Sequence, residues 1–182
     1  DEHLGRNTAV DLGVPGEAVA VYNPRKEGGG LEDAALRAGR VIVWRGFCHV
    51  HTAFQAEQVK RVRESIPDAR VIVHPEAPEE VVRLADAHGS TAAIIKYVEQ
   101  APAGSTVVVG TEFNLVERLA REHAGRVAVK ALSPSICTNM AKTREGSLLD
   151  VLENFDRTRE IHVPPEVARD ARAALERMLS LR

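Results

Sequence analysis

Val41-Ile42-Val43-Trp44 is the stretch that decides the fold, because it is a short apolar run with no polar residue on either face. Such a run suits a strand that is covered on both sides, as the strands of parallel sheets are. Val107-Val108-Val109 has the same character. Together with similar runs elsewhere, these two predict strands at Ala18–Tyr22, Val41–Trp44, Arg70–Val73, Thr106–Val109, Val127–Lys130 and Glu160–Val163.

Amphipathic segments with helical spacing lie between the predicted strands. They predict helices at Gly30–Ala38, Thr52–Ser65, Pro78–Ala87, Thr91–Gln100, Asn114–His123, Leu148–Phe155 and Pro165–Leu181. Strands that alternate with helices indicate βαβ units and parallel sheets. The fold class that follows is α/β, built from three-layer αβα units.

Composition excludes several classes of function. Hydrophobic residues make up 44% of the 182 residues and charged residues 27%, which is ordinary for a globular protein. The net charge of −2 offers no electrostatic footprint for nucleic acid or for an anionic membrane. No apolar stretch approaches the roughly 18 to 20 residues that span a bilayer. With two cysteines and no disulfide framework, we expect a cytoplasmic protein.

The first residues of the sequence are unusual for a chain start. The sequence begins at Asp1 without a methionine, and Asp1–Val14 resembles the inside of a helix and its exit. We therefore expect the chain to be a fragment of a longer protein.

Residues whose side chains can bind metals or transfer protons follow several of the predicted strands. In open parallel sheets, ligands bind in the crevice outside the carboxyl ends of the strands. The residues that come directly after these strands include Cys48, His49, His51, His74, Glu76, Glu112 and Cys137. The sequence thus predicts a functional edge that carries both cysteines.

The two cysteines allow two interpretations. A lone cysteine is often a small buried hydrophobic residue. Cys48 and Cys137, however, each lie in a loop with glycine or proline, where ligands of bound groups are common. Two thiolates are too few for a [4Fe–4S] cluster, so a cluster would need a cysteine from elsewhere.

The remaining polar residues also have both a chemical and a structural interpretation. His74 and Glu76 flank Pro75 and suit an acid/base pair, but Glu76 also suits the first turn of a helix. Ser90 and Thr91 suit either a helix cap or an anion site. Glu112 is interpreted as structural.

Taken together, the loops resemble the quinolinate synthase family, and specifically its C-terminal portion. The motifs that carry this resemblance follow one another along almost the whole sequence. They are Val43-Trp44-Arg45-Gly46-Phe47-Cys48-His49-Val50-His51, His74-Pro75-Glu76, Gly89-Ser90-Thr91, Gly110-Thr111-Glu112-Phe113-Asn114-Leu115-Val116 and Cys137-Thr138-Asn139-Met140.

The resemblance implies an enzyme of NAD biosynthesis that condenses iminoaspartate with dihydroxyacetone phosphate to quinolinate. It implies a [4Fe–4S] cluster in which Cys48 and Cys137 are two of three cysteine ligands, with the open iron acting as a Lewis acid. Glu76 is then the expected general base beside His74. His74, Pro75, Glu76, Ser90 and Thr91 are the expected substrate-binding residues.

The resemblance also implies how the chain is organised. The family has three similar αβα domains around a pseudo-threefold axis. By this likeness residues 1–39 end the second domain and form a linker, 40–160 form the third domain, and 161–182 form a strand and helix that pack back on the first domain. The N-terminal part, which carries the third cluster cysteine, is the expected partner of this chain. We expect the chain alone to be inactive.

Two other functions compete with this one. His49, His51 and His74 with Glu76 as base would suit a zinc-dependent hydrolase. A non-catalytic α/β module that binds a partner through a sheet edge or its last helix is the third hypothesis.

Overall fold

The computed structural model describes residues 1–155 and 160–181 of the chain. These residues form helices and parallel strands, so the expected α/β class is confirmed. The chain divides into two compact units, Asp1–Thr138 and Asn139–Arg182. Within the described ranges, no helix is both long enough and apolar enough to cross a membrane.

Four parallel strands form the larger sheet of the first unit. They are β3 (Arg70–Val73), β4 (Ala87–His88), β5 (Thr106–Gly110) and β6 (Ala128–Ala131). Their order across the sheet is β4-β3-β5-β6. β3 and β5 are neighbours in a register that pairs Val73 with Gly110. The residues that follow these two strands therefore start from adjacent points on one edge.

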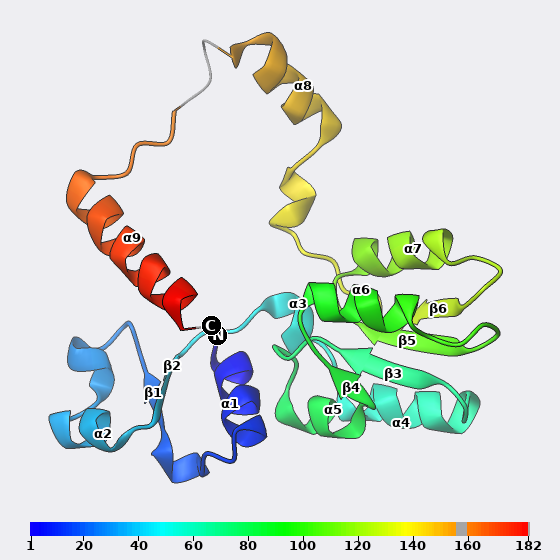
Figure 1. Cartoon of the computed structure of the whole chain (residues 1–182), viewed down its shortest axis with the longest axis horizontal. Helices are drawn as coiled ribbons and strands as arrows, with labels where there is room; N and C mark the ends of the chain where they lie inside the picture. The colour runs from blue at the N-terminus through cyan, green and yellow to red at the C-terminus, as the bar shows by residue number, and fades with distance from the viewer. Residues whose placement is uncertain (156–159, 182) are drawn as a thin grey trace. The chain divides into compact units, whose positions relative to one another are not determined.

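The side chains of the central strands alternate between two cores. Under α4 (Ala56–Ser65) and α5 (Glu79–Leu84) lie the side chains of Val71, Val73 and Val108. Under α6 (Thr91–Glu99) and α7 (Phe113–Glu122) lie those of Ile72, Val107 and Val109. Figure 1 shows the two helix pairs on opposite sides of the sheet. Each buried side chain of this kind contributes about 1.5–3 kcal/mol. This sheet is a three-layer αβα unit, as expected.

The strand order places a topological switch between β3 and β5. The chain leaves β3 through α5 on one face and returns from β4 through α6 on the other face. The connections after β3 and β5 thus lead to opposite faces of the sheet. Open α/β sheets bind their ligands at such points.

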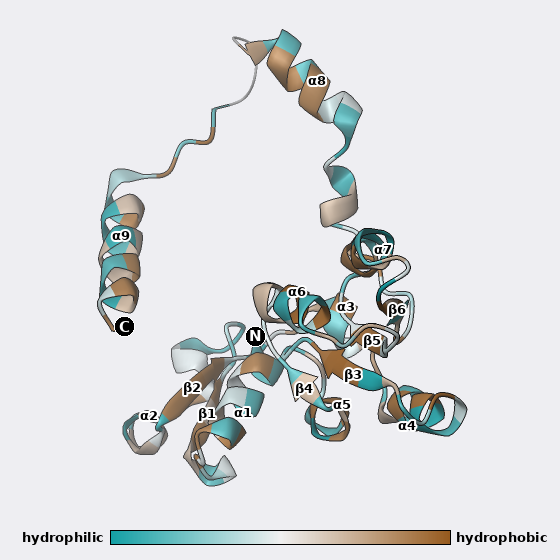
Figure 2. Cartoon of the chain, turned by 45° about the vertical axis from the view of Figure 1, so that its right-hand side comes forward, coloured by the Kyte–Doolittle hydropathy of each residue, from teal (hydrophilic) through white to brown (hydrophobic). Residues whose placement is uncertain are grey.

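A second, two-stranded sheet lies in the same unit. β1 (Val19–Tyr22) and β2 (Val41–Trp44) pair in parallel. α1 (Glu2–Asp11) packs against β2, and a Cβ on Gly5 would overlap the side chain of buried Val43. Figure 2 shows apolar residues along β2 and β3, and polar residues on the outer faces of α1 and α4.

α1 is fastened to the larger sheet by one buried side chain. The Nδ2 of Asn7 donates to the Pro75 carbonyl oxygen at 2.7 Å and to the Ala77 carbonyl oxygen at 2.9 Å. These two carbonyls belong to the loop that follows β3. The first helix therefore supports the backbone that carries Glu76.

Short elements complete the described part of the chain. In the first unit these are η1 (Gly16–Ala18), η2 (Glu27–Gly30), α2 (Asp33–Ala38) and α3 (His49–Thr52). The second unit contains η3 (Met140–Lys142), α8 (Glu145–Glu153) and α9 (Pro165–Ser180). The large apolar side chains of α8 and α9 are exposed, among them Leu148, Leu152, Leu175 and Met178.

Most expected elements are present, but several differ from expectation, among them the two-residue strand β4, which the sequence did not predict. The strand expected at Glu160–Val163 is wrong, because these residues have no strand assignment. The helix expected at Thr52–Ser65 begins only at Ala56, as α4, since α3 ends at Thr52. The helix expected at Pro78–Ala87 ends at Leu84. The domain boundaries at 39/40 and 160/161, and the three-domain architecture, stay predictions.

Candidate functional site

The candidate site lies at the switch between β3 and β5. His74-Pro75-Glu76 leaves β3, and Thr111-Glu112 leaves β5. The backbone N–H of His74 donates to the carbonyl oxygen of Gly110 at 2.9 Å, which extends the sheet pairing by one bond. The two loops therefore diverge only after His74 and Thr111.

His51 of α3 lies between these loops. Its Nδ1 lies 2.8 Å from Oε2 of Glu76, and its Nε2 lies 3.1 Å from Oγ1 of Thr111. An ionised carboxylate only accepts hydrogen bonds, so Nδ1 carries the proton and Nε2 accepts from the threonine hydroxyl when the ring is neutral. Thr111, His51 and Glu76 thus form a directed chain of hydrogen bonds.

Burial keeps His51 neutral. The side chain is almost fully enclosed, and this desolvation lowers the pKa of His51, an effect that the Glu76 carboxylate opposes only in part. His51 therefore orients the carboxylate as a neutral donor.

His74 adds a second neutral ring to the site. Its imidazole stacks on that of His51, with ring centroids 4.1 Å apart and an interplanar angle of 8°. Burial lowers the pKa of His74, and the neighbouring His51 lowers it further. Nδ1 of His74 accepts the backbone N–H of Glu76 at 3.3 Å, so its proton lies on Nε2. The expected placement of His74 beside Glu76 agrees with this geometry, since Nδ1 lies 3.8 Å from Oε2.

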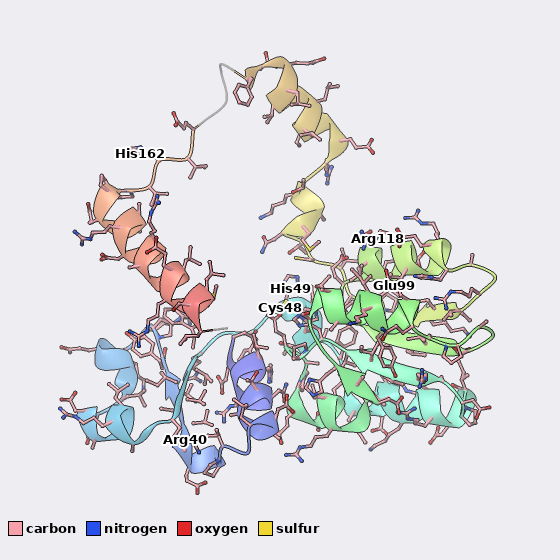
Figure 3. All side chains as sticks on the ribbon, viewed as in Figure 1. Arg40, Cys48, His49, Glu99, Arg118 and His162 are labelled. Carbon is pink, nitrogen blue, oxygen red and sulfur yellow. The ribbon has the colours of Figure 1, made fainter. Side chains whose placement is uncertain are left out.

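Cys48 lies beside this hydrogen-bonded chain. Ligand atoms of Cys48, His51 and Glu76 all lie within 4.8 Å of one another. Thiolate, imidazole and carboxylate are the groups that bind zinc and iron. Cys48 immediately precedes α3, and Figure 3 shows it next to His49. Both ring nitrogens of His51 already take part in hydrogen bonds, so Cys48 is the member of the group best suited to ligation.

Cys137 lies in a loop that is joined to the loop of Cys48. The hydroxyl of Ser135 donates to the carbonyl oxygen of Val50 at 2.8 Å. Ser135 precedes Cys137 by two residues, and Val50 follows Cys48 by two. Both cysteines are half-buried, so neither is sealed in the hydrocarbon core. Cys137 is not a member of the compact group formed by Cys48, His51 and Glu76.

Ser90 and Thr91 follow β4 at the same edge of the sheet. The hydroxyl of Ser90 accepts the backbone N–H of Ala93 at 3.3 Å, which confirms the capping interpretation for α6. Thr91 is exposed in the first turn of that helix. Glu112 accepts the backbone N–H of Asn114 at 2.8 Å, so its structural role as the cap of α7 is also confirmed.

The structure also reveals roles that the sequence did not predict. The sequence predicted no separate role for Thr111, and for His51 it predicted a place at the functional edge and, in the zinc hydrolase hypothesis, metal ligation. The zinc hydrolase hypothesis is not supported, because His49 is exposed and belongs to no candidate metal group of the described residues, while both nitrogens of His51 are engaged. The position of Thr111 after a buried strand was the signal that could have found it.

Comparison with known proteins yields one consistent result. The family model described as Quinolinate synthetase A protein matches residues 1–180. The quinolinate synthase of Corynebacterium glutamicum is 44% identical over 186 residues, which cover 100% of this chain and 47% of that protein. Those of Bacillus subtilis and Streptomyces coelicolor are 41% and 45% identical, and the matches cover 100% of this chain and 50% and 48% of those proteins. The chain spans about half the length of the curated relatives it matches.

Proposed function

Because the chain belongs to the quinolinate synthase family, we propose that it forms the C-terminal half of an enzyme that condenses iminoaspartate with dihydroxyacetone phosphate to quinolinate. The product is the precursor of the pyridine ring of NAD, and the location is the cytoplasm. The other half of the active site then belongs to an upstream part of the polypeptide, which is the partner of this chain.

The observation that carries this proposal is the position of Cys48 beside the Thr111–His51–Glu76 chain. A thiol suited to ligation and a carboxylate suited to proton transfer lie within 4.8 Å of each other at the switch point of the sheet. Such a pairing suits chemistry in which a metal polarises an oxygen of the substrate while a base moves a proton nearby.

The residues present fit a share of an iron–sulfur cluster. Cys48 and Cys137 lie in two loops joined by the Ser135–Val50 hydrogen bond, and both side chains are accessible to a bound group. They would supply two thiolates of a [4Fe–4S] cluster, and an upstream cysteine would supply the third. Such a cluster, once bound, supplies a Lewis-acidic iron that polarises a hydroxyl or carbonyl group.

The carboxylate of Glu76 is the proposed general base. His51 donates to Oε2, so that oxygen is held in place, while the neutral ring of His74 stacks on His51 and walls one side of the site. A base held in one orientation removes a proton from a substrate carbon or hydroxyl more effectively than a mobile one. Both ring nitrogens of His51 are engaged in hydrogen bonds, so Glu76 is the group that we assign to proton transfer.

The start of α6 is the proposed site for an anionic group of the substrate. Ser90 and Thr91 carry hydroxyls at the start of α6, where the first backbone N–H groups of a helix have no partner within the helix. Both proposed substrates carry anionic groups, either carboxylates or a phosphate. His74, Pro75 and Glu76 lie at the same edge, because β4 pairs with β3.

The test uses the full-length polypeptide, with its upstream half, and the variant Glu76→Gln. We expect the rate of quinolinate formation to fall by at least about 10²-fold, because the amide cannot accept a proton. Glu80→Gln is the matched control, since Glu80 is exposed on α5. Wild-type turnover in Glu76→Gln would refute the role of Glu76.

The isolated chain gives a second test. We expect that the isolated chain does not bind a stoichiometric cluster and does not produce quinolinate, because the upstream part of the polypeptide supplies one cluster cysteine and part of the site. Iron, labile sulfide and product would be measured on the 182-residue chain. A full cluster with robust turnover would contradict the proposed division of the active site.

A further inference from the structure

The backbone N–H of each cysteine donates to a carboxylate. That of Cys48 donates to Oδ2 of Asp1 at 2.9 Å, and that of Cys137 donates to Oε1 of Glu112 at 3.3 Å. The two carboxylates come from different elements, one before α1 and the other before α7. The same arrangement therefore occurs at both cysteines.

Glu112 is the more enclosed of the two carboxylates. It is 7% exposed, and it accepts three N–H groups, all from amides. The backbone and side-chain nitrogens of Asn114 supply two of them, at 2.8 and 2.9 Å. One carboxylate thus ties the beginning of α7 to the backbone of Cys137. Burial of an ionised group costs free energy, which three hydrogen bonds and the positive end of the helix offset.

Asp1 connects Cys48 to α1 in the same way. Oδ1 of Asp1 accepts the backbone N–H of Leu4 at 3.0 Å and caps α1, while Oδ2 accepts the N–H of Cys48. Because α1 is also fastened to the Glu76 loop through Asn7, the position of Cys48 is linked to that of the proposed base.

We propose that Asp1 and Glu112 are positioning residues that fix the two thiolates for the cluster and hold its reduction potential low. The inference about the cluster rests on the proposed function. The backbone N–H of each cysteine donates to a carboxylate, and each carboxylate adds negative charge beside a ligand. Hydrogen bonds to sulfur and net charge are two of the factors that set cluster potentials. Negative charge disfavours the reduced cluster, so the oxidised form suited to Lewis-acid chemistry is favoured.

The first experiment tests the hydrogen bonds without any cluster. Selective ¹⁵N labelling of cysteine in the 182-residue chain gives two backbone amide signals, because the chain has two cysteines. We expect Glu112→Gln to shift only the Cys137 signal and Asp1→Asn to shift only the Cys48 signal. The exposed residues Glu117 and Asp68 provide the matched controls Glu117→Gln and Asp68→Asn, which should move neither signal.

The assignment would be overturned if the Cys137 signal did not shift in Glu112→Gln and the Cys48 signal did not shift in Asp1→Asn. If a variant fails to fold, the unaltered chain still decides the question. Its two cysteine amide protons should show the small temperature coefficients of hydrogen-bonded groups, and solvent-like coefficients would refute the proposal. This measurement does not depend on quinolinate synthesis, so it can fail while the proposed function stands.

The second experiment measures the cluster in the full-length polypeptide. We expect Glu112→Gln to shift the midpoint potential to a more positive value in an EPR-monitored titration, or to lower the iron content per chain. Glu117→Gln should leave both quantities unchanged. A full complement of iron with an unchanged potential in Glu112→Gln would overturn the positioning role.

Discussion

The hydroxyl of Thr111 is the end of the hydrogen-bond chain that orients Glu76, and removing it should cost measurable stability. Thr111→Val keeps the branched shape of the side chain and replaces the hydroxyl by a methyl group. Thr111 is 3% exposed and His51 is 8% exposed, so water does not readily replace the lost donor at Nε2. An unsatisfied buried acceptor costs about 1–3 kcal/mol. The added methyl group returns up to about 0.8 kcal/mol. We therefore expect the free energy of unfolding to fall by about 0.2–2.2 kcal/mol.

Urea denaturation of the 182-residue chain, followed by circular dichroism, measures this difference. Thr106→Val is the matched control, because Thr106 begins β5, the strand that Thr111 directly follows, and its side chain is less buried. Thr111→Ser keeps the hydroxyl and should retain the orienting hydrogen bond. The reasoning would be wrong if Thr111→Val were as stable as the wild-type chain while its His51 ring nitrogens kept their wild-type ¹⁵N shifts.

Three further predictions follow from the same site. The lowered pKa values of His51 and His74 mean that the unfolded chain takes up protons below pH 6.5 while the folded chain does not. The free energy of unfolding should therefore be highest above pH 6.5 and decrease at lower pH, by at most about 1.4 kcal/mol per pH unit for each histidine. Urea titrations at several pH values measure this dependence, and a free energy of unfolding that does not change with pH would contradict it. Asn7→Ala removes two hydrogen bonds to the loop after β3 and should destabilise the chain by about 1–3 kcal/mol in urea denaturation, whereas an unchanged midpoint would argue against that link. Gly110→Ala places a Cβ against the fully buried Val73. Overpacking of this kind costs about 1–3 kcal/mol of folding free energy, so the melting temperature should fall. An unchanged melting temperature would show that β3 and β5 accommodate the added Cβ without strain.

The sequence predicted the sheet well where one physical signal dominated. β2 and β3 have the expected bounds, β1 and β5 differ from expectation by one residue at one end, and β6 is shifted by one residue at both ends. Runs of β-branched apolar residues favour strands that are covered on both faces, so the sequence of such a run nearly determines its position in the sheet. Because the ends of the strands were predicted, the residues that follow them could also be placed at one edge of the sheet.

What the sequence could not provide is the detail of pairing and of side-chain contacts. β4 is a strand of only two residues, Ala87–His88, inside a segment with helical spacing, so periodicity favoured the helix. His51 was interpreted as a metal ligand, since a His-x-His pattern does not reveal that Glu76 and Thr111 occupy both ring nitrogens. Such contacts join residues 25 and 60 positions apart, and they depend on the tertiary fold.

The small sheet of β1 and β2 has a practical consequence for how the chain should behave in solution. Two strands alone are marginally stable, and Ile42 and Trp44 on β2 are 52% and 54% exposed. In amide hydrogen exchange, the first 45 or so residues should thus exchange through local opening long before the amides of β3 and β5 do. Deuterium uptake would divide the first unit into a fast-exchanging N-terminal part and a protected remainder.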